Sequence, residues 1–78
     1  MQYVYLLKCS DGTVYTGCTN DVAERLQRHQ NGYVSSTASK LPVQLIWFCA
    51  FVDKHQAFEF EKYLKSGSGI AFRNKHLI

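Results

Sequence analysis

The chain has 78 residues, of which 46% are hydrophobic, and its formal net charge is +3. This length leaves room for one domain, residues 1–78, and the apolar content with a single proline argues against a disordered chain. No run approaches the roughly 20 apolar residues that cross a membrane, and the N-terminus does not read as a secretory signal. We therefore expect a cytoplasmic protein whose charge is compatible with a phosphate-rich partner.

The first predicted element is a β-hairpin with strands at residues 3–8 and 13–17. Both segments are rich in β-branched and aromatic residues, and turn-forming residues separate them. A three-residue loop ending at a left-handed Gly12 would pair Tyr5 with Gly17 and put Tyr5 and Tyr15 on one face. A two-residue Asp11-Gly12 turn would shift the register by one and separate the tyrosines. The local pattern leaves both registers open.

A helix is predicted next, with Asn20 as its N-cap, Asp21 in its first turn and Gly32 at its end. Its inward stripe is predicted to consist of Val22, Ala23, Leu26 and Gln30. Arg25 and His29 are four residues apart, so they stack along one border of this stripe. Two tyrosine hydroxyls, a guanidinium and an imidazole could therefore converge where the sheet meets the helix.

This combination resembles the GIY-YIG nuclease superfamily, and most closely its small stand-alone bacterial members. The resemblance rests on Tyr5, the Tyr15-Thr16-Gly17 triplet, Arg25 and His29, and extends to the segment AFEFEKYLKSGSG near the C-terminus. The triplets are weak signals, and the spacing of tyrosine, glycine, arginine, histidine and a later helical glutamate is far more specific. Cys18 stands where some relatives carry a lysine.

The segment from Tyr33 to Pro42 is predicted to be a loop rich in serine and threonine. Its hydroxyls, including Thr37, and its lysine, Lys40, could hold a nucleic-acid backbone, or the segment could be an ordinary polar connection. Cys9, Cys18 and Cys49 are too widely spaced for a zinc motif and are expected to be reduced thiols.

The segment from Val43 to Val52 is apolar on both faces and is predicted to be a strand that pairs with the hairpin and is covered on both sides. One face is expected to carry Val43, Leu45, Trp47, Cys49 and Phe51. Trp47 is interpreted as a core residue, because a base-stacking aromatic usually lies among basic residues. An exposed Trp47 would instead favour a protein-interaction module.

A second helix is predicted from an N-cap at Asp53, with Gln56 at the reciprocal capping-box position, to about Lys65. Its buried stripe is expected to consist of Ala57, Phe60 and Leu64. Glu61 falls within this stripe, where a carboxylate is costly unless it is paired or binds a metal. An i,i+4 ion pair with Lys65 is the structural alternative.

Counting the acids leaves Glu61 as the one carboxylate available for chemistry, because the other five acids belong to a turn, to helix starts or to outward faces. A single carboxylate suits Mg²⁺ (or Mn²⁺), which keeps most of its waters, but not a two-metal site. The resemblance independently implies the same metal-ligand role for Glu61.

The segment Ser66-Gly67-Ser68-Gly69 is predicted to end the second helix and to lead into a short last helix, Ile70 to His76. Glycines at a helix start can bind an anion, but helix-to-helix turn chemistry explains the segment as well. Basic residues around it that could contact phosphate are Lys65, Arg73 and Lys75.

Together these elements predict an α+β fold, in which a small, mainly antiparallel three-stranded sheet is flanked by helices in the order ββαβαα. The resemblance implies a metal-dependent endonuclease that acts on nucleic acid, most plausibly DNA, with Tyr5, Tyr15, Arg25, His29 and Glu61 as its catalytic residues. With no length for a recognition module, cleavage is expected to follow DNA structure or a partner protein rather than sequence. The alternative is an inactive nucleic-acid-binding or protein-interaction module of the same fold.

Overall fold

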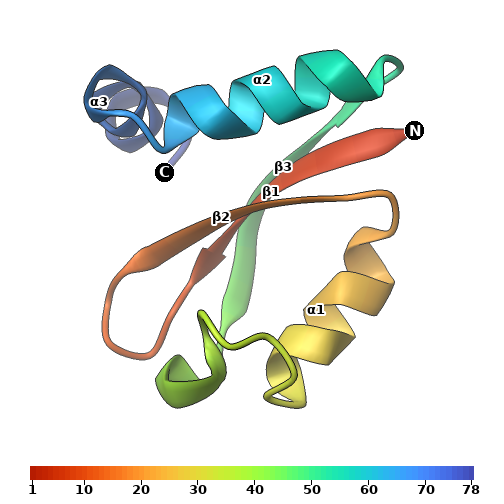
Figure 1. Cartoon of the computed structure of the whole chain (residues 1–78). Coiled ribbons are helices and arrows are strands. Elements are labelled where there is room, and N and C mark those ends of the chain that lie inside the picture. Colours follow the sequence, from red (N-terminus) through yellow and green to blue (C-terminus); the bar gives the residue numbers. More distant parts are fainter.

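The computed structural model describes residues 1–78 and confirms an α+β fold with the element order ββαβαα. Three antiparallel strands form one sheet in the order β2-β1-β3, so the N-terminal strand is central. The elements are β1 (Gln2–Lys8), β2 (Val14–Thr19), α1 (Val22–Gln30), the 3₁₀ turn η1 (Ala38–Lys40), β3 (Gln44–Phe51), α2 (Lys54–Leu64) and α3 (Gly67–His76). The sheet separates α1 from α2 and α3 (Figure 1).

The hairpin adopts the three-residue loop, so the first of the two predicted registers is the one formed. Gly12 has a φ of +87°, and the Cys9 amide donates to the Thr13 carbonyl at 2.9 Å. Tyr5 therefore lies opposite Gly17. This register puts Tyr5 and Tyr15 on the same face, with ring centroids 6.2 Å apart.

Alternate residues of β1 feed two separate apolar clusters, one on each face of the sheet. The cluster between the sheet and α2 is built on Val4, Leu6, Ala57 and Leu64, which are fully buried. The cluster on the α1 side is built on Tyr5, Leu7, Cys9 and Val43. The central strand is thus buried on both faces, which holds Tyr5 firmly within the sheet.

The prediction that alternate residues of β3 line one face is wrong, because a bulge interrupts the strand. β1 pairs Leu6 with Trp47 but Leu7 with Leu45, so one extra residue lies between them. Leu45 consequently packs on the α1 side and Trp47 on the α2 side. Trp47 contacts the Phe60 ring at a centroid distance of 6.2 Å, which confirms its interpretation as a core residue.

The expectation that β3 is covered on both faces is also wrong. Phe48 is 53% exposed, and Val52, just beyond the strand, is 88% exposed. The reason lies in the strand order, because β3 is an edge strand and α1 covers only the other end of this face (Figure 1).

Helix α1 begins one residue later than predicted. The side chain of Asp21, not Asn20, is the N-cap and accepts a hydrogen bond from the Glu24 amide at 3.0 Å. Gly32 ends the helix as predicted, with a φ of +77° and its amide bonded to the His29 carbonyl at 3.0 Å.

The predicted inward stripe of α1 is rotated relative to the one observed. Ala23 and Gln30 are exposed, and His29 is the only fully buried residue of the helix. The helix turns its Arg25–His29 border inward, because the His29 imidazole finds polar partners beneath the helix. Gln30 instead bonds the Val43 carbonyl at 2.7 Å from the edge of the helix.

Helix α2 begins at the predicted cap, since Asp53 accepts from the His55 amide at 2.8 Å, although the reciprocal bond from Gln56 is not formed. Helix α3 begins at Gly67, three residues before the predicted start, with Ser66 as its N-cap. A Cβ on Gly69 would collide with the Tyr63 carbonyl, so this glycine lets α3 pack directly on the end of α2. No helix of the chain combines the length and the apolar character that a membrane crossing requires.

Candidate active site

A buried chain of polar side chains joins the sheet to helix α1 and the following loop. The Tyr5 hydroxyl lies 2.9 Å from His29 Nε2, and His29 Nδ1 lies 2.7 Å from Thr37 Oγ1. The relative exposure of Tyr5 is 1%, and that of His29 and Thr37 is 0%. Buried polar groups of this kind are tolerated because each has a partner.

The hydrogen bonds of this chain assign the tautomer of His29. Thr37 Oγ1 has the Val34 carbonyl as a second partner at 3.5 Å, and a carbonyl can only accept. The Thr37 hydroxyl therefore donates to Val34 and accepts from His29 Nδ1–H. His29 Nε2 is then unprotonated and accepts from the Tyr5 hydroxyl, which gives Tyr5 a path for its proton.

Burial sets the protonation states of this pair. Burial and then the nearby positive charge of Arg25 lower the pKa of His29, so its imidazole is neutral at pH 7. Burial raises the pKa of Tyr5 far above its ordinary value, and Tyr15 adds to this shift. Arg25 opposes the shift without cancelling it, so the pKa of Tyr5 in the free protein stays above its ordinary value.

Gly17 is the residue that makes room for the Tyr5 ring. A Cβ at this position would lie 2.8 Å from Tyr5 Cε1 and closer still to Cζ and the hydroxyl oxygen. The missing side chain of Gly17 therefore leaves the space that the Tyr5 ring occupies. Because β2 is an edge strand, the ring lies across the sheet toward an open edge.

Arg25 lies beside Tyr5 and His29, and its positive charge acts on the pKa of both. Its Nε is buried and has no hydrogen-bond partner, and Arg25 takes part in no ion pair. A buried donor on a cation normally has an acceptor, so an unpartnered one calls for an explanation. An anionic ligand would supply the missing acceptor.

Tyr15 is the more accessible of the two tyrosines. Its ring packs edge-on against His29 at a centroid distance of 5.0 Å and is only partly buried. It also lines an open groove of about 250 Å³ at the edge of β2. Tyr5 therefore has the proton path, whereas Tyr15 has the contact with solvent.

Glu61 approaches the same edge from helix α2, on the other face of the sheet. Its negative charge contributes to the raised pKa values of Tyr5 and Cys18, after the larger effect of burial. The raised pKa keeps the Cys18 thiol protonated, which agrees with a packing role. Glu61 Oε2 bonds Lys65 Nζ at 2.9 Å, so the i,i+4 pair considered from the sequence is formed.

The donor set fits a metal held by one carboxylate. The Glu61 side chain is 22% exposed, so it can be reached from solvent, and its Oε1 makes no hydrogen bond within the protein. No cluster of three or more histidine, cysteine or acidic side chains exists that could enclose a metal. Such a set matches Mg²⁺, which commonly binds through one or two carboxylates and substrate phosphate.

The predicted phosphate contacts are distributed unevenly. Thr37 is fully buried on His29, so its expected surface contact with a nucleic-acid backbone is wrong. Lys40 lies at the hairpin turn, 3.9 Å from Asp11, on the far side from α2. Arg73 lines the groove with Tyr15 and Lys65, whereas Lys75 is exposed on α3.

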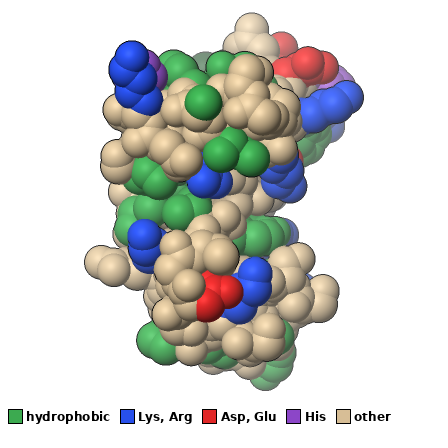
Figure 2. Space-filling model, turned by 90° about the vertical axis from the view of Figure 1, so that its left-hand side faces the viewer, with side chains coloured by type: hydrophobic (Ala, Val, Ile, Leu, Met, Phe, Trp, Pro, Cys, Tyr) green, Lys and Arg blue, Asp and Glu red, His purple; other side chains and the backbone are tan.

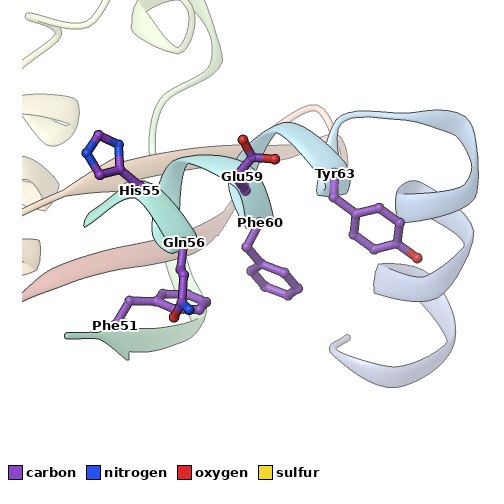
Figure 3. Close-up of a pocket in the computed structure, with 6 residues that line it drawn as sticks. All are labelled: Phe51, His55, Gln56, Glu59, Phe60 and Tyr63. Carbon is purple, nitrogen blue, oxygen red and sulfur yellow. The ribbon is translucent and has the colours of Figure 1, made fainter. Parts of the chain in front are cut away.

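The largest hollow of the surface lies elsewhere, between α2 and the end of β3. It has a volume of about 520 Å³ and is lined by Phe51, His55, Gln56, Glu59, Phe60 and Tyr63. In Figure 3 the rings of Phe51, Phe60 and Tyr63 lie below α2, whereas His55 and Glu59 project above it. None of the predicted catalytic residues lines this hollow, so size alone does not identify the site.

The support of His29 by Thr37 is the functional contact that the sequence pattern missed. Eight residues and a loop separate the two side chains, so no helical or strand periodicity relates them. The usable signal is the hydroxyl-rich composition of the loop, which fits a phosphate-binding surface and an ordinary polar connection equally well. The structure instead uses one of these hydroxyls inside the molecule.

Known proteins are similar to this chain in both sequence and fold. Residues 1–73 match the GIY-YIG catalytic domain. A UPF0213 protein of Clostridium perfringens is 42% identical over 66 residues, covering 83% of this chain and 71% of that protein. A UPF0213 protein of Cupriavidus pinatubonensis is 40% identical over 74 residues, covering 90% and 82%.

The solution NMR structure of a UPF0213 protein from Bacillus halodurans has a similar architecture. It superposes with a TM-score of 0.60 at 34% identity, covering 96% of this chain and 84% of that one. The match to the catalytic domain spans all of the strands, α1, α2 and most of α3, and so includes every residue of the candidate site. The chain therefore belongs to the GIY-YIG catalytic domain family.

Proposed function

We propose that this chain is a divalent-metal-dependent endonuclease that hydrolyses phosphodiester bonds in DNA, with residues 1–78 as one catalytic domain. Family membership implies nuclease chemistry on nucleic acid, and the finer assignment rests on the site. The observation that carries it is Arg25, whose buried Nε has no partner within the protein. A phosphate at the edge of β2 would accept from the partly exposed guanidinium of Arg25 and bring the Arg25 charge next to the reacting group.

In this proposal Arg25 stabilises the negative charge that grows on the phosphate during attack. A donor held in place before the reaction acts strongly at such a charge, because nothing has to reorganise. Burial of Nε keeps water from satisfying this N–H in the free protein. The His29 and Tyr5 hydrogen bond lies directly beside it, so charge stabilisation and proton transfer occur at one place.

Tyr15 orients the attacking water, because it is the accessible tyrosine of the pair. The water loses its proton to Tyr5 as the Tyr5 proton passes to His29 Nε2, so Tyr5 ends as it began. As the water oxygen bonds to phosphorus, the bond from phosphorus to the leaving 3′-oxygen breaks, and solvent water protonates that oxygen. The neutral state of His29, which its lowered pKa ensures at pH 7, makes it ready to accept this proton. The Thr37 hydroxyl holds the imidazole in the required tautomer and orientation.

Glu61 is the side chain that would hold Mg²⁺ or Mn²⁺. The metal, when bound, supplies Lewis-acid stabilisation of charge on the phosphate oxygens. The ion pair with Lys65 neutralises the carboxylate in the free protein and leaves it accessible at its other oxygen. Lys65 itself then remains beside the nucleic acid as a phosphate contact.

Glu61→Gln tests the proposal, since it keeps the shape of the side chain and removes its charge. We expect Mg²⁺-dependent nicking of a supercoiled plasmid to vanish in the variant and excess metal to restore little of it. An exposed i,i+4 pair contributes about 0.3–0.5 kcal/mol, so the melting temperature should fall by only about 1–4 °C. Nicking at the wild-type rate in Glu61→Gln would remove the metal site and most of the mechanism with it.

The Glu61–Lys65 pair also favours a second candidate, an inactive nucleic-acid-binding module in which the pair is only structural. This module would bind DNA without metal-dependent cleavage, and Glu61→Gln would affect stability alone. A nicking assay of the wild-type protein with and without Mg²⁺ separates the two. The wild type is expected to nick many plasmid sites, because no element of the chain is left over to read base edges.

A further inference from the structure

The groove beside Tyr15 is a second feature of the site edge, and apart from Tyr15 and Lys65 the proposed chemistry uses none of its lining residues. It lies between β2 and the corner where α2 meets α3, and Tyr15, whose ring packs on His29 on the opposite face of the sheet, borders it at the strand edge. Seen from this side, the molecule narrows at its middle, where green apolar and blue basic side chains lie next to one another on the surface (Figure 2). The lining residues are Val14, Tyr15, Thr16, Leu64, Lys65, Ile70 and Arg73.

The charge of this groove is positive and only partly compensated. No acidic residue lines it. The charge of Lys65 is neutralised by an ion pair with Glu61, in which Nζ lies 2.9 Å from Oε2. Arg73 forms no ion pair, and its Nε and Nη2 donate to the neutral Asn74 Oδ1 at 3.1 and 3.0 Å. Asn74 thus orients the guanidinium without neutralising it, which leaves an uncompensated cation in the groove lining.

The remaining lining is apolar and small. Leu64 is fully buried at the base, and Val14 and Ile70 lie beside it, with Ile70 38% exposed. The volume of about 250 Å³ is below the roughly 300–1,000 Å³ of pockets for drug-sized ligands. One nucleotide, with a charged phosphate and an apolar face on its sugar and base, matches both the size and this mixture of surfaces.

We propose that this groove binds one unpaired nucleotide next to the scissile phosphate, with its phosphate on Arg73 and its sugar and base against Ile70. The inference rests on the proposed function, because it places the reacting phosphate at Tyr15 and Arg25. A nucleotide in a duplex is held in its base stack and cannot enter a recess of this size. The chain therefore selects nucleic acid with a single-stranded segment at the cleavage site, such as a flap or a frayed end.

The test is binding, measured without metal so that cleavage cannot occur. Fluorescence anisotropy with a labelled single-stranded thymidine oligonucleotide and a labelled duplex gives both affinities over a range of salt concentrations. We expect Arg73→Ala to weaken single-strand binding about tenfold and to reduce its salt slope by about 0.7, with a smaller effect on the duplex. Ile70→Ser should weaken single-strand binding with no change in the salt slope, since it removes no charge.

Two further variants control for charge and folding. Arg28→Ala removes a matched arginine from the outer face of α1, where it pairs with Glu24 at 3.7 Å, and should leave both affinities unchanged. Arg73→Lys should retain most of the affinity if the phosphate contact is electrostatic. Thermal melts of each variant identify any loss of folding, and Ile70→Ala replaces Ile70→Ser if the latter is unstable.

The outcomes separate this inference from the proposed function. Equal losses for single strand and duplex in Arg73→Ala, or equal losses in Arg73→Ala and Arg28→Ala, would overturn the groove as a nucleotide site. A wild-type protein that prefers single strands through Arg73 but cleaves nothing with Mg²⁺ would keep the groove and refute the nuclease. A wild type that nicks duplex and flap equally well, unaffected by Arg73→Ala, would keep the nuclease and refute the groove.

Discussion

Replacing Gly17 with alanine tests the geometry of the site most directly. The new Cβ would lie 2.8 Å from Tyr5 Cε1 and closer still to Cζ and the hydroxyl oxygen, which real Cβ atoms do not tolerate. The Tyr5 ring cannot simply move, because it is 1% exposed and its hydroxyl is bonded to His29 at 2.9 Å. The ring must therefore shift at the expense of its packing, its hydrogen bond or both.

The magnitude follows from these contacts. Overpacking of a buried site costs about 1–3 kcal/mol, and loss of the buried hydrogen bond costs about 0.5–1.5 kcal/mol more. Alanine regains about 0.5 kcal/mol over glycine in a strand, which leaves a net loss of about 1–4 kcal/mol. In a domain of this size that loss lowers the melting temperature by about 4 °C or more. Cleavage should fall further than stability, because Tyr5 and His29 move apart.

Gly67→Ala is the matched control. A Cβ at Gly67 meets no atom within 4 Å, and the residue opens helix α3, so alanine should leave stability unchanged or raise it by up to about 1 kcal/mol. Urea unfolding and plasmid nicking are measured on both variants under the same conditions. If Gly17→Ala is as stable and as active as Gly67→Ala, then Tyr5 does not lie over Gly17 and the arrangement of the site described above is refuted.

Four further substitutions probe the polar chain and the charge at the site. Arg25→Ala should slow single-turnover nicking about 10²–10³-fold while weakening DNA binding much less, and equal losses of rate and affinity would contradict its catalytic role. Lys40→Ala should change only the affinity for DNA, and only slightly. Thr37→Val leaves Nδ1–H of His29 unsatisfied and should lower the free energy of unfolding by about 1–3 kcal/mol in urea titrations, whereas an unchanged value would mean that water replaces the hydroxyl. The pKa of His29 is lowered on folding, so as the pH falls the unfolded chain takes up a proton at His29 before the folded chain does. The stability of the wild type should therefore drop below about pH 6.5, and melting curves of His29→Gln should lack this drop. Identical pH profiles of the two proteins would refute the assignment.

The order of elements and the position of the hairpin could be predicted because they depend on local chemistry. The alternation around Tyr5 and Tyr15 and the turn residues before Gly12 each act within a few positions, and the structure has the register that they allow. The choice between the two registers depended on whether the loop closes over two or three residues. That choice is decided by packing of the whole sheet, which no local rule contains.

The errors arose where tertiary contacts override periodicity. The bulge in β3 moves Trp47 to the face opposite Leu45, and a strict two-residue alternation cannot anticipate an inserted residue. Helix α1 was expected to bury its most apolar sector, but it buries the imidazole of His29 instead. A buried polar residue is stable only through its partners, and Thr37 was not recognisable as one from its position in a loop.

The edge of β2 is where the two faces of this sheet can act on one substrate. The polar chain of Tyr5 and His29 belongs to the α1 face, whereas Glu61 comes from α2 on the opposite face. A side chain at Gly17 would displace the Tyr5 ring that crosses the strand there. The central strand is buried on both sides and offers no such opening, and β3 carries neither a partnered imidazole nor a carboxylate at its edge. A domain with so few acidic residues can thus bring one carboxylate, one guanidinium and one proton path together only at this edge. The proposed chemistry therefore depends on Gly17, although this residue takes no part in it.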